Sequence, residues 1–125
     1  MSVTCYRDLN VWQKAMDLVV ICYRVCEQFP RTEMYGLCSQ LQRAAVSVPA
    51  NIAEGHGRQS TREYLHHVSI SYGSLMELET HVAIAQRLGY ISENSTKPLF
   101  DLTREVGRML NGLMQSLRQK LSSNP

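Results

Sequence analysis

Carboxylates and imidazoles recur along one stretch of this 125-residue chain. Glu63 and His66 form a Glu-x-x-His motif, and His67, Glu77 and His81 follow on the same broad helical stripe. A di-metal site in a helical bundle needs two such motifs, so this single copy does not predict one. A mononuclear or intersubunit metal is the alternative to histidines on a solvated face, which we favour. We therefore predict no metal ligand and no cofactor, and whether His66, His67 or His81 binds a metal stays open.

Patterns that activate a nucleophile or bind a phosphate in a loop are also missing. The four cysteines, Cys5, Cys22, Cys26 and Cys38, show no CxxC pair and no zinc-finger spacing. Because free cysteine packs like a small apolar residue, we expect reduced core thiols, with a disulfide or a thiol-based function as the alternative. The glycine-containing segment 55–58 lacks the lysine of a phosphate-binding loop. The sequence therefore predicts a protein that is not an enzyme.

A basic stripe lies opposite the leucines of the last predicted helix. Its members are Lys97, Arg104, Arg108, Asn111, Gln115 and Arg118, with Asp101 the only acid among them. Such a stripe can follow a phosphate backbone and bind it with salt-sensitive, sequence-independent affinity. The alternative, which the residues alone favour, is a solvated face whose cations suit the C-terminal end of a helix.

The turn between the second and third predicted helices adds Arg58 and Arg62 to the basic residues. Glu54 precedes this turn, at a helix C-terminus where the helix dipole disfavours an anion. We therefore expect Glu54 to pair with Arg58, with Arg62 or with a group on another chain. Part of this basic cluster then has a structural role.

Length and charge narrow the class of protein further. A chain of 125 residues fits one domain, over residues 1–125. The net charge is only +2, so bulk charge does not by itself argue for nucleic acid. The most apolar run, residues 18–22, is too short to span a bilayer, and no signal sequence opens the chain. These features predict a cytoplasmic protein that has no membrane partner.

Apolar residues recur at the alternating spacings of three and four that amphipathic helices show. We expect helices over about residues 10–28, 33–54, 61–88 and 96–121. Asn10 and Thr32 are suitable N-caps for the first two, and Ser60 with Glu63 forms a capping box for the third. Because the connections are short, sequential helices should pack antiparallel. The sequence therefore predicts an all-α, up-down-up-down four-helix bundle.

Proline and glycine mark four positions in these helices. Pro49 predicts a kink near Val48, or a break after which Pro49 begins a second helix. The helix that begins near residue 96 tolerates Pro98 in its first turn. Gly73 lies in the middle of the third helix, where glycine usually marks the close approach of another backbone. Gly89 is expected to end that helix.

The second helix has packing surface on both sides of a polar stripe. One apolar stripe contains Leu37, Leu41, Ala44, Val48 and Ile52. The polar stripe contains Glu33, Gln40, Arg43, Ser47, Asn51 and Glu54. Beyond it lie the small residues Ser39, Val46, Ala50 and Ala53. An ordinary surface helix has one wide charged face, so we expect this helix to be central, with its small-residue face at a subunit contact.

Residues 40–55, QLQRAAVSVPANIAEG, are similar to the signature of the four-helix bundle family named for the 23S rRNA intervening sequence protein. Shorter segments at residues 9–15, 33–37, 73–80 and 88–90 resemble the family in the same order, so the likeness extends from about residue 6 to 121. The resemblance implies a ring-like homopentamer and a family without catalytic residues. It also implies an origin in a large-subunit rRNA insertion, or an accessory role beside a reverse transcriptase in a diversity-generating retroelement.

The signature matches at Gln40, Arg43, Ser47, Pro49, Asn51, Glu54 and Gly55. We interpret these residues as mainly structural, because a buried Asn51 or Glu54 without partners would lower stability by about 1–3 kcal/mol or more. They should therefore form hydrogen bonds within or between protomers. Gln42 stands where the family often has a basic residue, which weakens any basic surface there.

Two hypotheses follow for the function. The first is a non-catalytic, oligomeric protein that binds RNA or DNA through a basic surface. Its candidate contacts are Lys97, Arg104, Arg108 and Arg118, with Arg58 and Arg62 as secondary contacts. The second is a protein-interaction scaffold whose partner is another protein, such as a reverse transcriptase.

Overall fold

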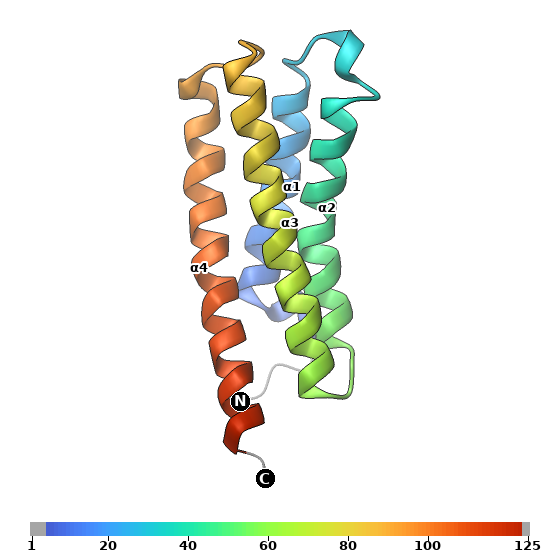
Figure 1. Cartoon of the computed structure of the whole chain (residues 1–125), viewed down its shortest axis with the longest axis vertical. Coiled ribbons are helices and arrows are strands. Elements are labelled where there is room, and N and C mark those ends of the chain that lie inside the picture. Colours follow the sequence, from blue (N-terminus) through green and yellow to red (C-terminus); the bar gives the residue numbers. More distant parts are fainter. Residues whose placement is uncertain (1–4, 124–125) are drawn as a thin grey trace.

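Four long helices run alternately up and down, so the first helix begins and the last helix ends at the same end of the bundle (Figure 1). The computed structural model describes residues 5–123. The helices are α1 (Asn10–Cys26), α2 (Leu37–His56), α3 (Thr61–Arg87) and α4 (Glu93–Ser123), and two short 3₁₀ turns are η1 (Tyr6–Asp8) and η2 (Arg31–Glu33). The prediction of an all-α, antiparallel four-helix bundle is confirmed.

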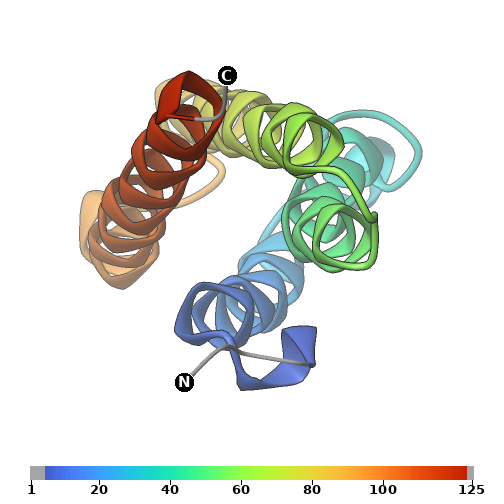
Figure 2. The same ribbon diagram turned by 90° about the horizontal axis from the view of Figure 1, so that it is seen from below.

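Each long helix packs against two neighbours, and α1 lies diagonally across from α3 (Figure 2). The contacting pairs are α1 with α2, α2 with α3, α3 with α4, and α1 with α4. Short connections produce this order, because consecutive helices can only fold back beside one another. The outward faces of α1 and α3 consequently point to opposite sides of the protomer.

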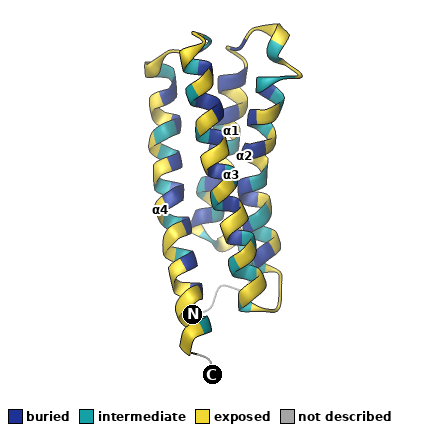
Figure 3. Ribbon diagram, viewed as in Figure 1, coloured by how far each residue is buried: buried dark blue, intermediate teal, exposed yellow. Residues whose placement is uncertain are grey.

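Buried residues occur along all four helices (Figure 3), and their apolar side chains form one hydrophobic core. The apolar stripe of α1 is buried throughout: Val11, Ala15, Leu18, Cys22 and Val25, with Phe29 just beyond the helix. The buried stripe of α4 is centred on Thr103, Leu110 and Met114, and the neighbouring Met109 and Leu113 are only half-buried. α4 packs against both α1 and α3.

Both ends of the predicted second helix differ from the structure. Residues 31–33 form η2, and α2 begins at Leu37 rather than near residue 33. The reason is local: Glu33 Oε1 accepts the backbone N–H of Leu37 at 3.2 Å, so this side chain satisfies a donor at the start of the helix. The helix ends at His56, two residues later than predicted.

The first helix is also shorter than predicted. It begins at Asn10, but the N-cap is Leu9, which makes no side-chain capping bond. It ends at Cys26 rather than at residue 28, and its last residues pass into a turn. The predicted N-cap role of Asn10 is therefore wrong.

Neither internal proline interrupts its helix. α2 continues through Pro49 to His56, so the alternative of a break and restart is wrong. One turn of α3 supports this part of α2, because Ser71 Oγ donates a hydrogen bond to the Val48 carbonyl oxygen at 2.7 Å. α4 begins at Glu93, three residues earlier than predicted, which places Pro98 in the second turn rather than the first.

The ends of α3 follow the prediction, but its internal glycine does not. Ser60 Oγ accepts the Glu63 backbone N–H at 3.0 Å, and Gly89, with φ of +77°, follows the last turn. Gly73 was expected at a close approach of backbones, yet a Cβ placed there has no described atom within 4 Å outside its own helix. The close approach is at Gly55, where a Cβ would stand 2.7 Å from His67 Cβ.

The N-terminal turn η1 packs against α1. The rings of Tyr6 and Trp12 form a T-shaped pair with centroids 5.3 Å apart, and the Arg7 guanidinium carbon lies 5.6 Å from the centroid of the same tyrosine. Residues 1–4 lie outside the described part of the chain.

Candidate nucleic-acid interface

The face that α3 and α4 form together contains a groove of about 300 Å³, which we call the α3/α4 groove. Its lining residues are Tyr72, Met76, Glu79, Thr103, Arg104, Gly107, Arg108 and Asn111. Residues three or four apart on a helix share one face, so Arg104, Arg108 and Asn111 follow the groove along α4. The structure thus places two of the predicted nucleic-acid contacts at one concave site.

The cations along α4 differ in how far acids engage them. Lys97 Nζ lies 3.3 Å from one oxygen of Asp101, and Arg104 Nη1 lies 3.9 Å from the other. Arg108 and Arg118 are exposed, and no carboxylate of residues 5–123 lies within ion-pair distance of either. Among the predicted contacts on α4, the positive charge that no acid neutralises is therefore carried by Arg108, which lines the α3/α4 groove, and by Arg118, which is nearer the end of the helix.

A second hollow, of about 450 Å³, adjoins this groove near the start of α4. Lys97 and Arg104 line it together with the acids Glu93 and Asp101. Arg104 lines both hollows, so they meet at its side chain. The mixed charge makes the second hollow less suitable for a phosphate than the α3/α4 groove.

The α3 wall contributes one carboxylate to the α3/α4 groove. Thr103 Oγ1 lies 2.9 Å from Glu79 Oε2 and also 2.9 Å from the Phe100 carbonyl oxygen, so its single proton serves one acceptor at a time. No ion pair joins Glu79 to Arg104 or Arg108 within the described chain. Arg108 therefore keeps its donors available, whereas Arg104 has Asp101 within ion-pair distance.

The secondary candidates Arg58 and Arg62 have different surroundings. Arg58 Nη2 lies 2.8 Å from Glu54 Oε1, and this hydrogen bond, followed by the charge of His67, lowers the pKa of Glu54. Of the partners expected for Glu54, namely Arg58, Arg62 or a group on another chain, the protomer provides Arg58. Arg62 is exposed in the first turn of α3, at the same end of the bundle as the last turns of α4 (Figure 1).

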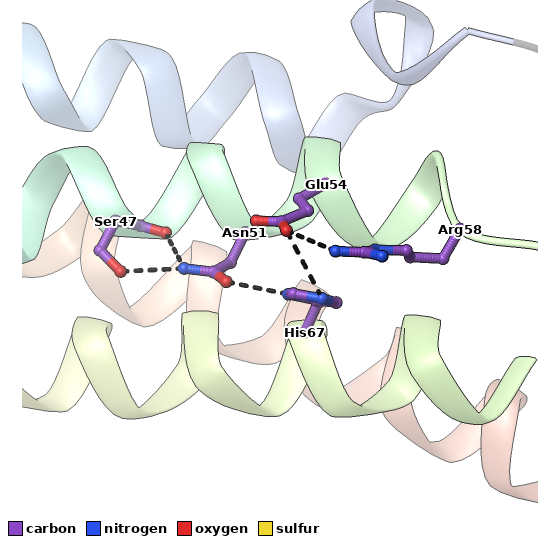
Figure 4. A network of polar contacts seen from close by, with 5 residues as sticks. All are labelled: Ser47, Asn51, Glu54, Arg58 and His67. Atoms are coloured by element: carbon purple, nitrogen blue, oxygen red, sulfur yellow. Dashed lines mark hydrogen bonds and ion pairs between the residues drawn. The ribbon is translucent and has the colours of Figure 1, made fainter.

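A polar network joins α2 to α3 on another side of the bundle (Figure 4). Asn51 Nδ2 donates to the Ser47 carbonyl oxygen and lies 3.0 Å from Ser47 Oγ, while Asn51 Oδ1 lies 3.1 Å from His67 Nδ1. His67 Nε2 in turn lies 3.9 Å from Glu54 Oε1. Two signature residues, Asn51 and Glu54, therefore contact one histidine of the neighbouring helix, and Ser47 joins the network through Asn51.

The remaining signature residues divide into two groups. Pro49 and Gly55 are buried, and Gly55 lies under His67 and Tyr64, where a side chain would not fit. Gln40 and Arg43 are exposed and form no side-chain hydrogen bond or ion pair with residues 5–123. On the small-residue face, Val46 and Ala50 are exposed, whereas Ser39 and Ala53 are half-buried, so residues 5–123 cover that face only in part.

The histidines do not form a metal site within residues 5–123, where no three histidine, cysteine or acidic side chains cluster suitably. They are also less solvated than expected. His81 is only 8% exposed, and neither ring nitrogen makes a hydrogen bond, although Nε2 lies 3.5 Å from Glu77 Oε1. The prediction of histidines on a solvated face is wrong for His67, which contacts Asn51 of α2, and for His81, which is buried.

Sequence reasoning missed a cavity of about 350 Å³ between α1 and α2. It is lined by Tyr23, Cys26, Glu27, Phe29, Pro30, Arg31, Met34, Cys38 and Gln42. The tight turn after α1 creates it, and the predicted longer helices had no place for such a turn. Sequence reasoning also missed Tyr72 and Gly107 as lining residues of the α3/α4 groove.

Comparisons with known proteins were made at the levels of sequence and fold. The family model described as 23S rRNA-intervening sequence protein matches residues 7–112. Among solved structures, the chain is similar to a protein of unknown function from the S23 ribosomal protein family of Bacteroides thetaiotaomicron VPI-5482. The identity is 19%, the match covers 83% of this chain and 97% of that chain, and the TM-score is 0.77, so this likeness shows the fold alone. No curated protein matches the chain.

Proposed function

The chain belongs to the 23S rRNA-intervening sequence protein family, and from this membership we propose a non-catalytic, oligomeric protein that binds RNA through the face of α3 and α4. The observation that carries the proposal is the pair Arg104 and Arg108 beside the α3/α4 groove, with Arg108 free of any ion pair in the described chain. A cytoplasmic location forms part of the proposal. No helix within residues 5–123 is long and apolar enough to cross a membrane.

Local charge rather than net charge supports RNA as the ligand. The chain as a whole carries only +2, but within the described residues no carboxylate forms an ion pair with Arg108 or Arg118, and Glu105 pairs with Lys14 instead. Lysine and arginine side chains release counterions when they neutralise phosphates, and this makes the affinity depend steeply on salt. A modest patch of this kind becomes effective when an oligomer repeats it.

Exposed apolar side chains support the oligomeric part of the proposal. On α1 they are Met16, Val20 and Tyr23, and on α3 they are Ile70 and Ile84, with Leu88 just beyond its last residue. Because the outward faces of α1 and α3 point to opposite sides, one copy can place its α1 face on the α3 face of the next. Such head-to-tail contacts generate closed rings, and we propose a homopentamer.

Charge reversal on α4 tests the RNA-binding proposal. We expect the double variant Arg108→Glu and Arg118→Glu to abolish binding of a structured RNA, while light scattering still finds the wild-type oligomer. Arg24→Glu changes an exposed arginine of α1 and is the matched control, which should keep most of the affinity. The proposal would be contradicted if Arg24→Glu lowered the RNA affinity as much as the double variant does. It would also be contradicted if RNA binding by the wild type did not weaken between low and high salt.

A protein-interaction scaffold is the second candidate function, with a reverse transcriptase as an example of the partner. The observation that favours it is the cavity between α1 and α2, which Phe29, Met34 and Tyr23 make largely apolar. Under this alternative, the purified protein ignores RNA at both salt concentrations and remains an oligomer. The basic stripe of α4 is then a solvated face.

A further inference from the structure

We propose that the α3/α4 groove binds one unpaired nucleotide of a single-stranded nucleic acid, with the base against Tyr72 and the flanking phosphates on Arg104 and Arg108. This inference rests on the proposed function and names the ligand class of the same site. It begins from the two walls of the groove, which differ in chemistry. Tyr72 and Met76 come from α3, whereas the two arginines come from α4.

The wall from α3 distinguishes an unpaired strand from a duplex. The cations of α4 alone would be enough to follow the phosphates of a duplex, because backbone contacts carry no requirement for an apolar surface. In a duplex the base faces are stacked on one another, so an aromatic side chain cannot reach them. Unpaired bases instead stack on aromatic side chains, and Tyr72 is half-buried at the groove with no hydrogen bond from its hydroxyl in the described chain.

A buried glycine keeps the groove open between these walls. Gly107 lies on α4 between the two arginines and Asn111, and a Cβ there would stand 3.4 Å from Leu75 Cδ2 and 3.9 Å from Tyr72 Cε2. Glycine inside a helix is about 1 kcal/mol less favourable than alanine. The resulting hollow of about 300 Å³ is at the small end of ligand sites, which suits a single base and not a larger ligand.

The groove also has polar groups that match the edge of a base. Asn111 supplies an amide, which can pair with adenine, and Glu79 supplies a carboxylate, which can accept a hydrogen bond from the amino group of cytosine. A carboxylate beside two arginines opposes simple phosphate binding. It is useful where a base amino group is bound next to a phosphate, which is the arrangement that we propose.

Fluorescence anisotropy with a labelled short oligonucleotide tests the inference. We expect the full-length protein to bind a single-stranded RNA containing adenine and cytosine more tightly than a duplex of the same length. Tyr72→Leu keeps an apolar side chain but removes the aromatic face, and it should weaken single-strand binding about tenfold because stacking contributes about 1–3 kcal/mol per base. Duplex binding should change little. The deoxy version of the same strand distinguishes RNA from DNA, and binding of either strand above its own duplex supports the inference.

One control variant and one further groove variant show whether a negative result reflects the groove inference, the folding of the variant or the proposed function. Tyr35→Leu changes an exposed tyrosine of the connection between η2 and α2 and should leave the single-strand preference intact. Asn111→Ala is an exposed change that should weaken single-strand binding without affecting folding. If wild-type protein binds duplex and single strand equally, or if Asn111→Ala and Tyr72→Leu both keep full single-strand affinity, the groove inference is wrong while RNA binding stands. If no nucleic acid binds at all, the proposed function itself fails.

Discussion

His67 Nδ1 lies 3.1 Å from Asn51 Oδ1, and this contact determines which nitrogen of the ring carries the proton. The amide nitrogen of Asn51 is already directed at Ser47, so the oxygen that faces His67 can only accept. The proton of a neutral ring is therefore on Nδ1. Nε2, which lies 3.9 Å from Glu54 Oε1, gains a proton only when the ring becomes charged and pairs with that carboxylate.

Removal of the Asn51 side chain should destabilise the protein. Asn51→Ala leaves the Nδ1 proton of His67 without its acceptor and removes the bonds to Ser47, so we expect the free energy of unfolding to fall by about 1–3 kcal/mol. Urea denaturation followed by circular dichroism measures the change. Gln115→Ala alters an exposed residue of α4 and should stay within about 0.5 kcal/mol of the wild type. Equal stabilities of the two variants would show that the network contributes nothing.

Two glycines should respond to alanine in opposite directions. In Gly55→Ala the new Cβ would stand 2.7 Å from His67 Cβ, an atom that cannot swing away, so we expect a loss of about 1–3 kcal/mol. In Gly73→Ala the Cβ has no described neighbour within 4 Å, so better helix propensity should add about 0.5–1 kcal/mol. Thermal unfolding of both variants checks the pair. A stabilised Gly55→Ala protein would contradict the packing of α2 on α3.

Acid should weaken a link between the two connections at one end of the bundle. The Tyr90 hydroxyl donates to Glu33 Oε2 at 2.8 Å, and this bond, followed by the Leu37 backbone N–H, lowers the pKa of Glu33. A carboxyl with a lowered pKa in the folded state stabilises the protein above its unfolded pKa of about 4.3 and loses this effect as the pH falls through the folded value. We therefore expect stability to fall on acidification below about pH 4.3.

The Tyr90→Phe variant isolates this contribution to the pH dependence. It removes the principal cause of the lowered Glu33 pKa, so the variant should lose less stability than the wild type over the same acidic interval. Urea unfolding at a series of pH values measures the difference. Parallel acid profiles of the two proteins would indicate that this hydrogen bond does not form.

The cysteines should react in a fixed order with a thiol reagent. Burial raises the pKa of Cys22 to about 12 and raises that of Cys26 as well, so few of these thiols are in the reactive thiolate form at neutral pH. Cys38 is buried too, whereas Cys5 is half-buried. We expect Ellman's reagent to modify Cys5 first in the native protein, and the Cys5→Ser variant to lose the fast phase. Rapid modification of four thiols in native protein would contradict the packing of the core.

Helix spacing predicts most of this fold, and long-range contacts decide what it misses. The α1 stripe follows from the sequence because one side of the helix carries all its core residues. The start of α2 does not, since Glu33 is held by Tyr90, which is 57 residues away in the chain. A reading of local capping signals has no access to such a partner, so it placed the helix start four residues too early.

Of the two walls of the α3/α4 groove, only the wall from α4 could be predicted from the sequence. Arg104 and Arg108 are recognisable as a stripe of α4 because their spacing is local. Tyr72 and Met76 are not, because the side of α3 that faces α4 depends on how the helices pack. His81 shows the same difficulty, since its position among polar residues suggested solvent, whereas the folded protomer buries it.

The contact between Tyr6 and Trp12 provides the protein with its own optical reporter. Trp12 is the only tryptophan in the chain. Fluorescence excited at wavelengths that tryptophan absorbs and tyrosine does not therefore comes from this one side chain, which contacts Tyr6. The contact lies where η1 meets α1, diagonally across the bundle from α3. Undocking of the N-terminal turn will therefore change the emission directly, whereas a ligand on the α3/α4 groove will change it only by altering the whole bundle or its assembly.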